Sequence, residues 1–355
     1  MFNPEYVGYL ESFKEIGIKP FKFKEERVRN RMGDDVSIFL LRDILYSILS
    51  LSPKRYVPYI YSWGKYVGMQ SARQTLGTLN LEFTTRLIVS LYRMKILDLE
   101  FYRDAFKKAW IYTKFGIPTF TYVNKATETF RIKTEECYQS FGLPNIKKRV
   151  CIFEDGIISG LFEYIFRKPV NSLEIQCNAA GDDCCEFSIS IDSEFPRLEI
   201  FDSKYFKKIR TSNLNRMLVE KILRPTLGDI TRLSIFQITY LGMWLSSSGA
   251  HTLLYWIGRE SGLELSKRRK IKDLKKFLNS LKLGFVESRK QGKKYIFTIE
   301  ECAFCYGSKN LNKRICSYVA GFLSGYMEKI TGKRTNVIET KCIANGDKHC
   351  EFVSI

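Results

Sequence analysis

The sequence has few of the residues on which enzyme active sites most often depend. It contains only two histidines, His251 and His349. It has no Gly-rich phosphate loop, no Gly-x-Ser-x-Gly turn and no pair of acidic residues in a recognisable catalytic context. These absences weigh against an enzyme, and we assign no catalytic residue.

Signals for export and for membrane insertion are also lacking. Glu5, Glu11 and Glu15 stand where a signal peptide would need a basic start followed by an apolar run. The longest uncharged stretch, between Arg232 and Arg259, has serines and a histidine near its centre. It therefore predicts a helix, a turn and a second helix, and we expect a cytoplasmic protein without a membrane span.

The composition predicts two folded domains. A chain of 355 residues is too long for one small core, and 45% hydrophobic residues with 14% aromatics indicate well-filled interiors. The formal charge of +19 would suit a polyanion such as nucleic acid, but it can equally be a solubility feature. Lys and Arg are densest in residues 259–294, so any phosphate contact is expected there.

An internal duplication organises the chain. Residues 135–190 align with residues 300–355 without a gap, and about two fifths of the aligned positions are identical. Weaker similarity extends upstream to the segments that begin at Gly33 and Gly228. We therefore expect an N-terminal extension (1–35), a first domain (36–192), a linker with a helix (193–229) and a second domain (230–355).

Both copies have the same predicted order of elements. A pair of helices comes first, broken in the first copy at Ser52 and Pro53. In the second copy an amphipathic helix and two strands joined at Gly292 follow, and each copy then has a helix and a closing hairpin that turns at Gly181 or Gly346. The first copy has extra residues that include a predicted helix at 81–97. Helices beside a small antiparallel sheet predict an α+β fold.

Four cysteines recur at equivalent positions in each copy, after a strand, at a helix start and on both arms of the closing hairpin. They are Cys137, Cys151, Cys177 and Cys185 in the first copy and Cys302, Cys316, Cys342 and Cys350 in the second. Converging thiolates suit tetrahedral zinc, with up to two ions per chain, and a helix start is expected to lower the pKa of Cys151. The alternatives are buried core cysteines and a redox pair.

Some further residues are weighed as accessory or ligand-binding. Cys184, Cys305 and His349 have no equivalent in the other copy and are treated as accessory. A repeated pair of helical glycines predicts close approach by a backbone or by a ligand. The candidates for lining a ligand pocket are Trp63, Tyr66, Gly156, Gly160, Trp256, Gly321 and Gly325. Tight packing of glycines and aromatics in the core is the alternative for all of them.

The closing hairpins carry a resemblance to a known family. The segments EIQCNAAGDDCCEF (174–187) and ETKCIANGDKHCEF (339–352) resemble the signature of the vinyl-4-reductase-type (4-vinyl reductase) domain. The resemblance implies a fold similar to the subunits of the TRAPP trafficking complex that hold an acyl chain. It also implies a Cys-rich zinc site and a hydrophobic pocket, in a family that is often archaeal and includes sensory modules of regulators.

The function that we expect from this resemblance is binding or sensing of an apolar small molecule without catalysis. One alternative is a nucleic-acid-binding or transcription-associated regulator that uses the basic segment 259–294, with Lys267, Arg268, Arg269 and Lys270 as contacts. A scaffold or assembly subunit is another. The two copies would imitate a homodimer within one chain, and the whole chain could itself form a homodimer.

Overall fold

The fold was analysed in a computed structural model. The structure describes residues 28–78, 100–124, 129–194, 196–219, 222–245, 249–268, 273–308 and 311–355. The predicted helix at 81–97 and residues 1–27 of the predicted N-terminal extension lie outside the described residues.

The first copy has helices on both sides of its strands in the chain. In order, its elements are β1 (Asp35–Ser37), α2 (Ile38–Leu51), α3 (Pro53–Thr78), α5 (Glu100–Thr113), β2 (Ile117–Asn124), β3 (Thr129–Glu135), α6 (Ile152–Phe166), β4 (Val170–Gln176), η1 (Asn178–Ala180) and β5 (Cys185–Ile191). The Ser37 hydroxyl caps α2 by accepting from the Phe39 N–H at 3.3 Å. Helix α3 begins at Pro53, where proline is tolerated, as the sequence predicts.

The second copy repeats this order after an intervening helix. Its elements are α7 (Ser203–Met217), β6 (Ile230–Arg232), α8 (Leu233–Leu245), α9 (Ala250–Arg268), α10 (Leu274–Ser280), β7 (Phe285–Gln291), β8 (Lys294–Glu300), α11 (Ser317–Thr331), β9 (Val337–Lys341), η2 (Ile343–Asn345) and β10 (Cys350–Ser354). The uncharged stretch forms α8 and α9, two helices as predicted. Among the described residues, every helix is too short or too polar to cross a bilayer.

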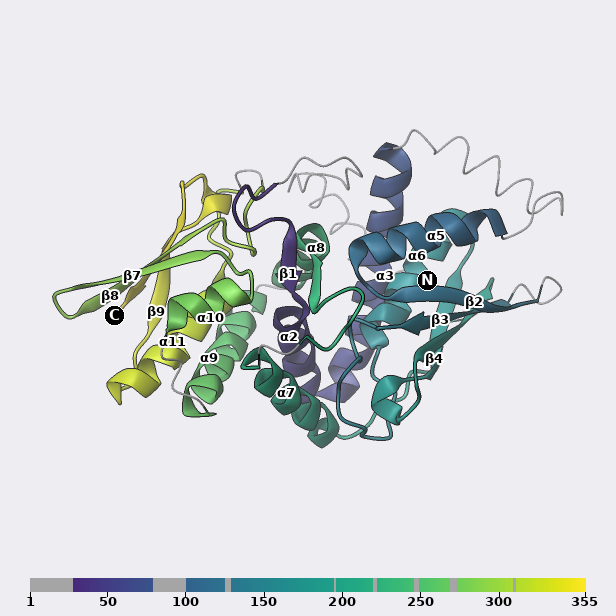
Figure 1. Ribbon diagram of the computed structural model, residues 1–355, viewed down its shortest axis with the longest axis horizontal. Helices are drawn as coiled ribbons and strands as arrows, with labels where there is room; N and C mark the ends of the chain where they lie inside the picture. Colours follow the sequence, from purple (N-terminus) through teal and green to yellow (C-terminus); the bar gives the residue numbers. More distant parts are fainter. Residues whose placement is uncertain are drawn as a thin grey trace.

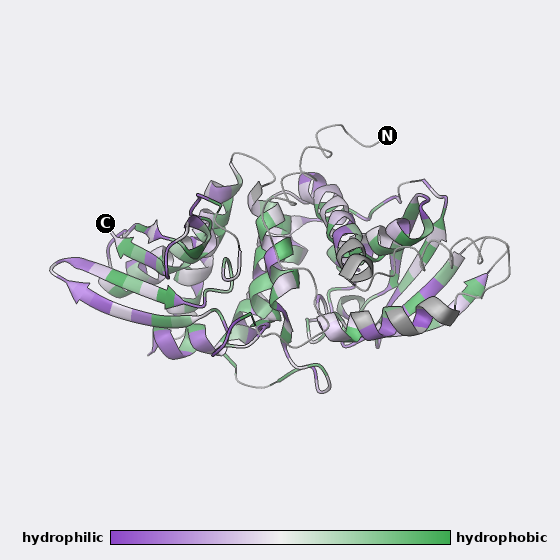
Figure 2. Cartoon of the chain, turned by 90° about the horizontal axis from the view of Figure 1, so that it is seen from above, coloured by the Kyte–Doolittle hydropathy of each residue, from purple (hydrophilic) through white to green (hydrophobic). Residues whose placement is uncertain are grey.

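Each copy contains a four-stranded antiparallel sheet, with the order β2-β3-β5-β4 in the first copy and β7-β8-β10-β9 in the second. Figure 1 shows these sheets at the two ends of the molecule, with α2, α7 and α8 between them. The tip of the β7–β8 hairpin is hydrophilic (Figure 2). The predicted α+β fold, a tandem repeat of helices beside a small sheet, is confirmed.

The leading segment of each copy has the pattern Arg-x3-Gly-Asp and packs on the other copy. The fully buried Arg29 guanidinium donates to the backbone oxygens of Lys282 at 2.8 Å and Glu301 at 3.3 Å in the second copy. Arg224, which is also fully buried, donates to the backbone oxygen of Lys114 at 2.8 Å in the first copy.

Two equivalent glutamates complete this exchange. The Glu301 carboxylate accepts from the backbone N–H groups of Arg31 and Met32, and the Glu136 carboxylate accepts from those of Thr226 and Leu227. Strand β1 then pairs antiparallel with β6 at the centre of the molecule (Figure 1). The two copies are thus held by reciprocal contacts and share one continuous hydrophobic core.

Candidate metal centres and ligand cavity

The structure brings the four repeated cysteines of each copy together in the interior. In the first copy Cys137 follows β3, Cys151 is the N-cap residue of α6, and Cys177 and Cys185 flank the turn between β4 and β5. All four are fully buried, and so are their equivalents in the second copy.

Cys151 lies at the hub of the first cluster. Its Sγ is 3.5 Å from that of Cys137, 3.9 Å from that of Cys177 and 3.6 Å from that of Cys185. Zinc–sulfur bonds of about 2.3 Å in a tetrahedron place two sulfurs about 3.8 Å apart. The spacing around Cys151 is therefore that of thiolates on one ion.

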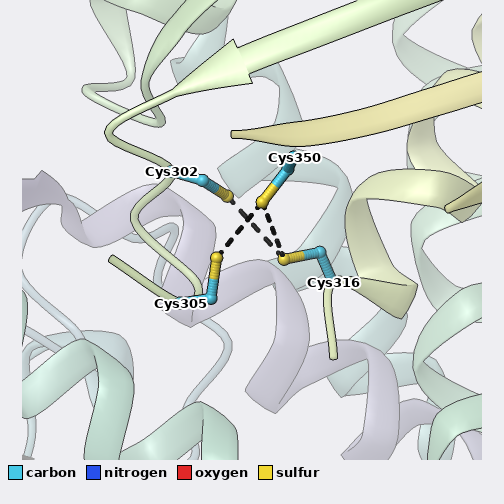
Figure 3. Close-up of side chains that lie close together, drawn as sticks. All are labelled: Cys302, Cys305, Cys316 and Cys350. Carbon is cyan, nitrogen blue, oxygen red and sulfur yellow. Dashed lines mark hydrogen bonds between the residues drawn. The ribbon is translucent and has the colours of Figure 1, made fainter. Parts of the chain in front are cut away.

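Cys316 is the equivalent hub in the second copy. Its Sγ is 3.8 Å from that of Cys302 and 3.9 Å from those of Cys342 and Cys350. Cys305, which the sequence analysis treated as accessory, is fully buried in this cluster, with its Sγ 3.2 Å from that of Cys350. Figure 3 shows the sulfurs of Cys302, Cys305, Cys316 and Cys350 pointing toward one another.

A glutamate completes the donor set that the two copies share. The ligand atoms of Cys151, Glu174, Cys177 and Cys185 all lie within 4.8 Å of one another, and those of Cys316, Glu339, Cys342 and Cys350 do the same. The sequence analysis quoted these glutamates only as part of the family signature. Their position three residues before a repeated cysteine was the signal that could have identified them.

The glutamates are oriented as metal ligands would be. Oε2 of Glu174 accepts from the Cys151 N–H at 2.8 Å, and Oε2 of Glu339 accepts from the Cys316 N–H at 2.9 Å. The other carboxylate oxygen, Oε1, is buried in both and has no hydrogen-bond partner among the described residues. Buried polar atoms are normally satisfied. Thiolates and a carboxylate are common zinc ligands, so the residues fit a zinc ion in each copy.

The Gly-Asp pair of each closing hairpin orients one of these cysteines. Gly181 has a φ of +107° and Gly346 a φ of +97°, a conformation that glycine adopts without strain. The next residue is an aspartate whose Oδ2 accepts from the backbone N–H of Cys177 at 2.7 Å or of Cys342 at 2.8 Å. The signature therefore has a geometric purpose at the cluster.

The thiols of the first cluster divide into two kinds. Burial acts to raise the pKa of all four, but hydrogen bonds from Cys151 and Cys185 outweigh it and hold the pKa of Cys137 and Cys177 well below the usual value. The pKa of Cys151 is instead raised, by burial and by its neighbours. The predicted lowering of this pKa by the helix start was wrong, because burial and adjacent thiolates have the larger effect.

The second cluster behaves in the same way. Hydrogen bonds from Cys305 and Cys316 hold the pKa of Cys342 well below the usual value, while burial raises the pKa of Cys316. Burial and the nearby Cys342 raise the pKa of Glu339 to about 10. Both clusters thus concentrate negative charge in a buried site, where a cation would stabilise it.

The glycines predicted to line a pocket lie instead where two helices cross. A Cβ at Gly156 or Gly160 would overlap the backbone oxygen of Tyr61 or Lys65 in α3. Gly321 and Gly325 stand in the same relation to the backbone of Tyr255 and Arg259 in α9. The close approach that the sequence predicted is therefore made by protein backbone. Helix packing, rather than a ligand, occupies the space beside these glycines.

The predicted aromatics are divided between interior and surface. Trp63 and Tyr66 are buried, with their rings stacked at 5.1 Å, and the Trp63 ring lies against Gly242 of α8. Trp256 has an exposed fraction of 46%. None of the three lines the cavity described next.

A cavity of about 340 Å³ lies between the two copies. Equivalent helices of both copies line it, α2 and α3 from the first and α8 and α9 from the second. The lining residues are Ile48, Arg55, Tyr56, Tyr59, Met243, Ala250, Leu253 and Leu254. Arg55 is the one charged residue in this lining.

The candidates for nucleic-acid contact are only partly described. Lys267 is exposed near the end of α9, and Arg268 is the last residue of that helix. Arg269 and Lys270 lie outside the described residues. Contact with nucleic acid stays a prediction.

The comparisons with known proteins agree on one family. The family model of the vinyl-4-reductase domain matches residues 130–191 and 295–354. An uncharacterized protein of Methanocaldococcus jannaschii is 33% identical over 134 residues, which are 36% of this chain and 78% of that protein.

Two solved structures are also similar to this chain. The crystal structure of a vinyl-4-reductase family protein from the same organism has 23% identity and a TM-score of 0.31, and covers 41% of this chain and 88% of its own. A trafficking protein particle complex subunit 3 from Naegleria fowleri, covalently bound to palmitic acid, has 16% identity and a TM-score of 0.34, and covers 45% of this chain and 98% of its own. With its repeated signature and its two matches to the family model, the chain belongs to the vinyl-4-reductase domain family.

Proposed function

We propose that this protein binds or senses a small apolar molecule without catalysis, and that one zinc ion braces each copy. The observation that carries the proposal is the donor set of three cysteines and one glutamate, repeated at equivalent positions with an unsatisfied carboxylate oxygen. When bound, zinc would supply a structural cross-link. It would tie the start of the last helix to the closing hairpin in each copy.

The cavity between the copies supports the binding of a small molecule. Its volume of about 340 Å³ is at the small end of the range of about 300–1,000 Å³ found for ligand pockets. Apolar and aromatic side chains supply most of the lining, and Arg55 offers one cation. The lining therefore favours an apolar body with an acidic or polar end.

Fluorescence of 1-anilinonaphthalene-8-sulfonate tests this cavity, because the dye combines an apolar ring system with an anionic group. Leu254→Trp should fill the space and abolish most of the fluorescence enhancement, and the smaller change Ala250→Leu should reduce it. His251→Trp adds the same indole to α9 at an exposed position outside the cavity and serves as the control. Equal enhancement in all three variants would exclude the cavity as the binding site.

The exchange of leading segments supports a second part of the proposal, that one chain forms what two single-copy proteins would form as a homodimer. The Arg29 and Arg224 contacts are reciprocal, as in an exchanged symmetric pair. In the relative from M. jannaschii, the matched 134 residues are 78% of the protein, which leaves room for only one copy. Expressed alone, that relative should be dimeric by sedimentation.

A further inference from the structure

The second copy contains two overlapping sets of metal donors. One set is Cys316, Glu339, Cys342 and Cys350, the set shared with the first copy. The other is Cys302, Cys305, Cys316 and Cys350, whose four sulfurs also lie within 4.8 Å of one another (Figure 3). Cys316 and Cys350 belong to both.

We propose that the second copy binds two divalent metal ions of the zinc class, bridged by the thiolates of Cys316 and Cys350. This inference rests on the proposed metal sites. A single tetrahedral ion would use four of the six donors and leave two of them buried without a partner. Two ions that share two bridging thiolates fill eight coordination positions with the same six donors, so every donor is used.

The charges agree with two ions. The five cysteines of this cluster are fully buried, where uncompensated thiolates are costly. Two dications against five thiolates and one carboxylate leave the same net charge as one dication against three thiolates and one carboxylate in the first copy. The extra cysteine therefore adds a second ion without adding net charge to the interior.

The first copy lacks the second set. Ser140 stands at the position equivalent to Cys305, with its Oγ 3.0 Å from the Cys185 Sγ. Cys137 donates from its Sγ to Glu154 Oε2 at 2.7 Å, and only Cys137, Cys151 and Glu154 form a further close group among the described residues of this copy. A cubane iron–sulfur cluster would not suit the second copy either, since its thiolates bind separate irons and lie further apart than four sulfurs on one ion.

Zinc content of the full-length chain, measured by elemental analysis after expression with zinc, tests the proposal. We expect three ions per chain in the unaltered protein, two in Cys305→Ser and three in the control Cys184→Ser, which removes a buried cysteine that lies in neither cluster. Serine already occupies the equivalent position in the first copy, and Cys305→Ala provides a second variant. Two ions in the unaltered protein, or no loss in either Cys305 variant, would overturn the proposal.

Cadmium-113 spectroscopy tests the bridge itself. In the cadmium-substituted chain two signals should be coupled to each other through the shared thiolates, and Cys305→Ser should abolish that coupling while leaving the signal of the first copy. Three uncoupled signals would contradict bridging. Cys177→Ser removes only the ion of the first copy, so failure of the basic metal site is distinguished from failure of the bridged pair.

Discussion

The exchanged leading segments make the stability of each copy depend on a residue from the other. Arg29 is fully buried and makes four hydrogen bonds, to the backbone oxygens of Gly33, Asp35, Lys282 and Glu301. The last two belong to the second copy. Replacing Arg29 with alanine would leave these buried carbonyls without their donor.

The size of the effect follows from these contacts. A hydrogen bond from a charged donor contributes about 1.5–3 kcal/mol. Loss of the two contacts between copies should therefore lower the free energy of unfolding by about 3 kcal/mol, out of a total of about 5–15 kcal/mol for a typical domain. Arg31→Ala is the matched control, because Arg31 pairs with Glu300 at the surface, where the side chains are 59% and 58% exposed. An exposed pair contributes about 1 kcal/mol or less.

Urea unfolding of the full-length chain, followed by circular dichroism, measures this difference. We expect Arg29→Ala to lower the midpoint clearly more than Arg31→Ala, and Arg224→Ala to resemble Arg29→Ala because its contact is equivalent. The double variant should separate the unfolding of the two copies into two transitions. Equal midpoints for Arg29→Ala and Arg31→Ala would refute the importance of the exchange.

Two further predictions concern the helix crossing and the closing hairpin. Gly160→Ala should destabilise the protein by about 3 kcal/mol, because its Cβ would overlap the Lys65 backbone oxygen, whereas Gly249→Ala has open space around it and should be nearly neutral in calorimetry. Asp182→Asn weakens the acceptor that orients Cys177 and should lower zinc affinity about tenfold in chelator competition. Asp183→Asn, at the exposed neighbouring position, should leave the affinity unchanged, and equal losses in both would contradict this role.

The repeat made much of this fold predictable from the sequence. Because the two copies align without a gap, each element could be inferred twice, and the hairpin at Gly181 and the pair α8 and α9 were placed correctly. The same reasoning failed for Cys305. It was set aside because the other copy has serine there, although it forms a C-x2-C pair with Cys302.

Other features could not be read from a single sequence for physical reasons. Glycine spacing predicts close approach, but only the packed structure shows that Gly156 and Gly160 meet a helix backbone rather than a ligand. The exchange joins Arg29 to Lys282, residues far apart in the chain, and local patterns carry no information on such a contact. The roles of Glu174 and Glu339 likewise depend on side-chain direction.

The most direct test of the account is the metal content of full-length protein purified without added metal. The account predicts bound zinc, with one ion lost in Glu174→Gln and one in Cys177→Ser, and none lost in Cys184→Ser. Thiol titration of the same samples should show the cluster cysteines protected until the metal is removed by a chelator. Absence of metal from the unaltered protein, with its cluster thiols free to react, would contradict the central claim.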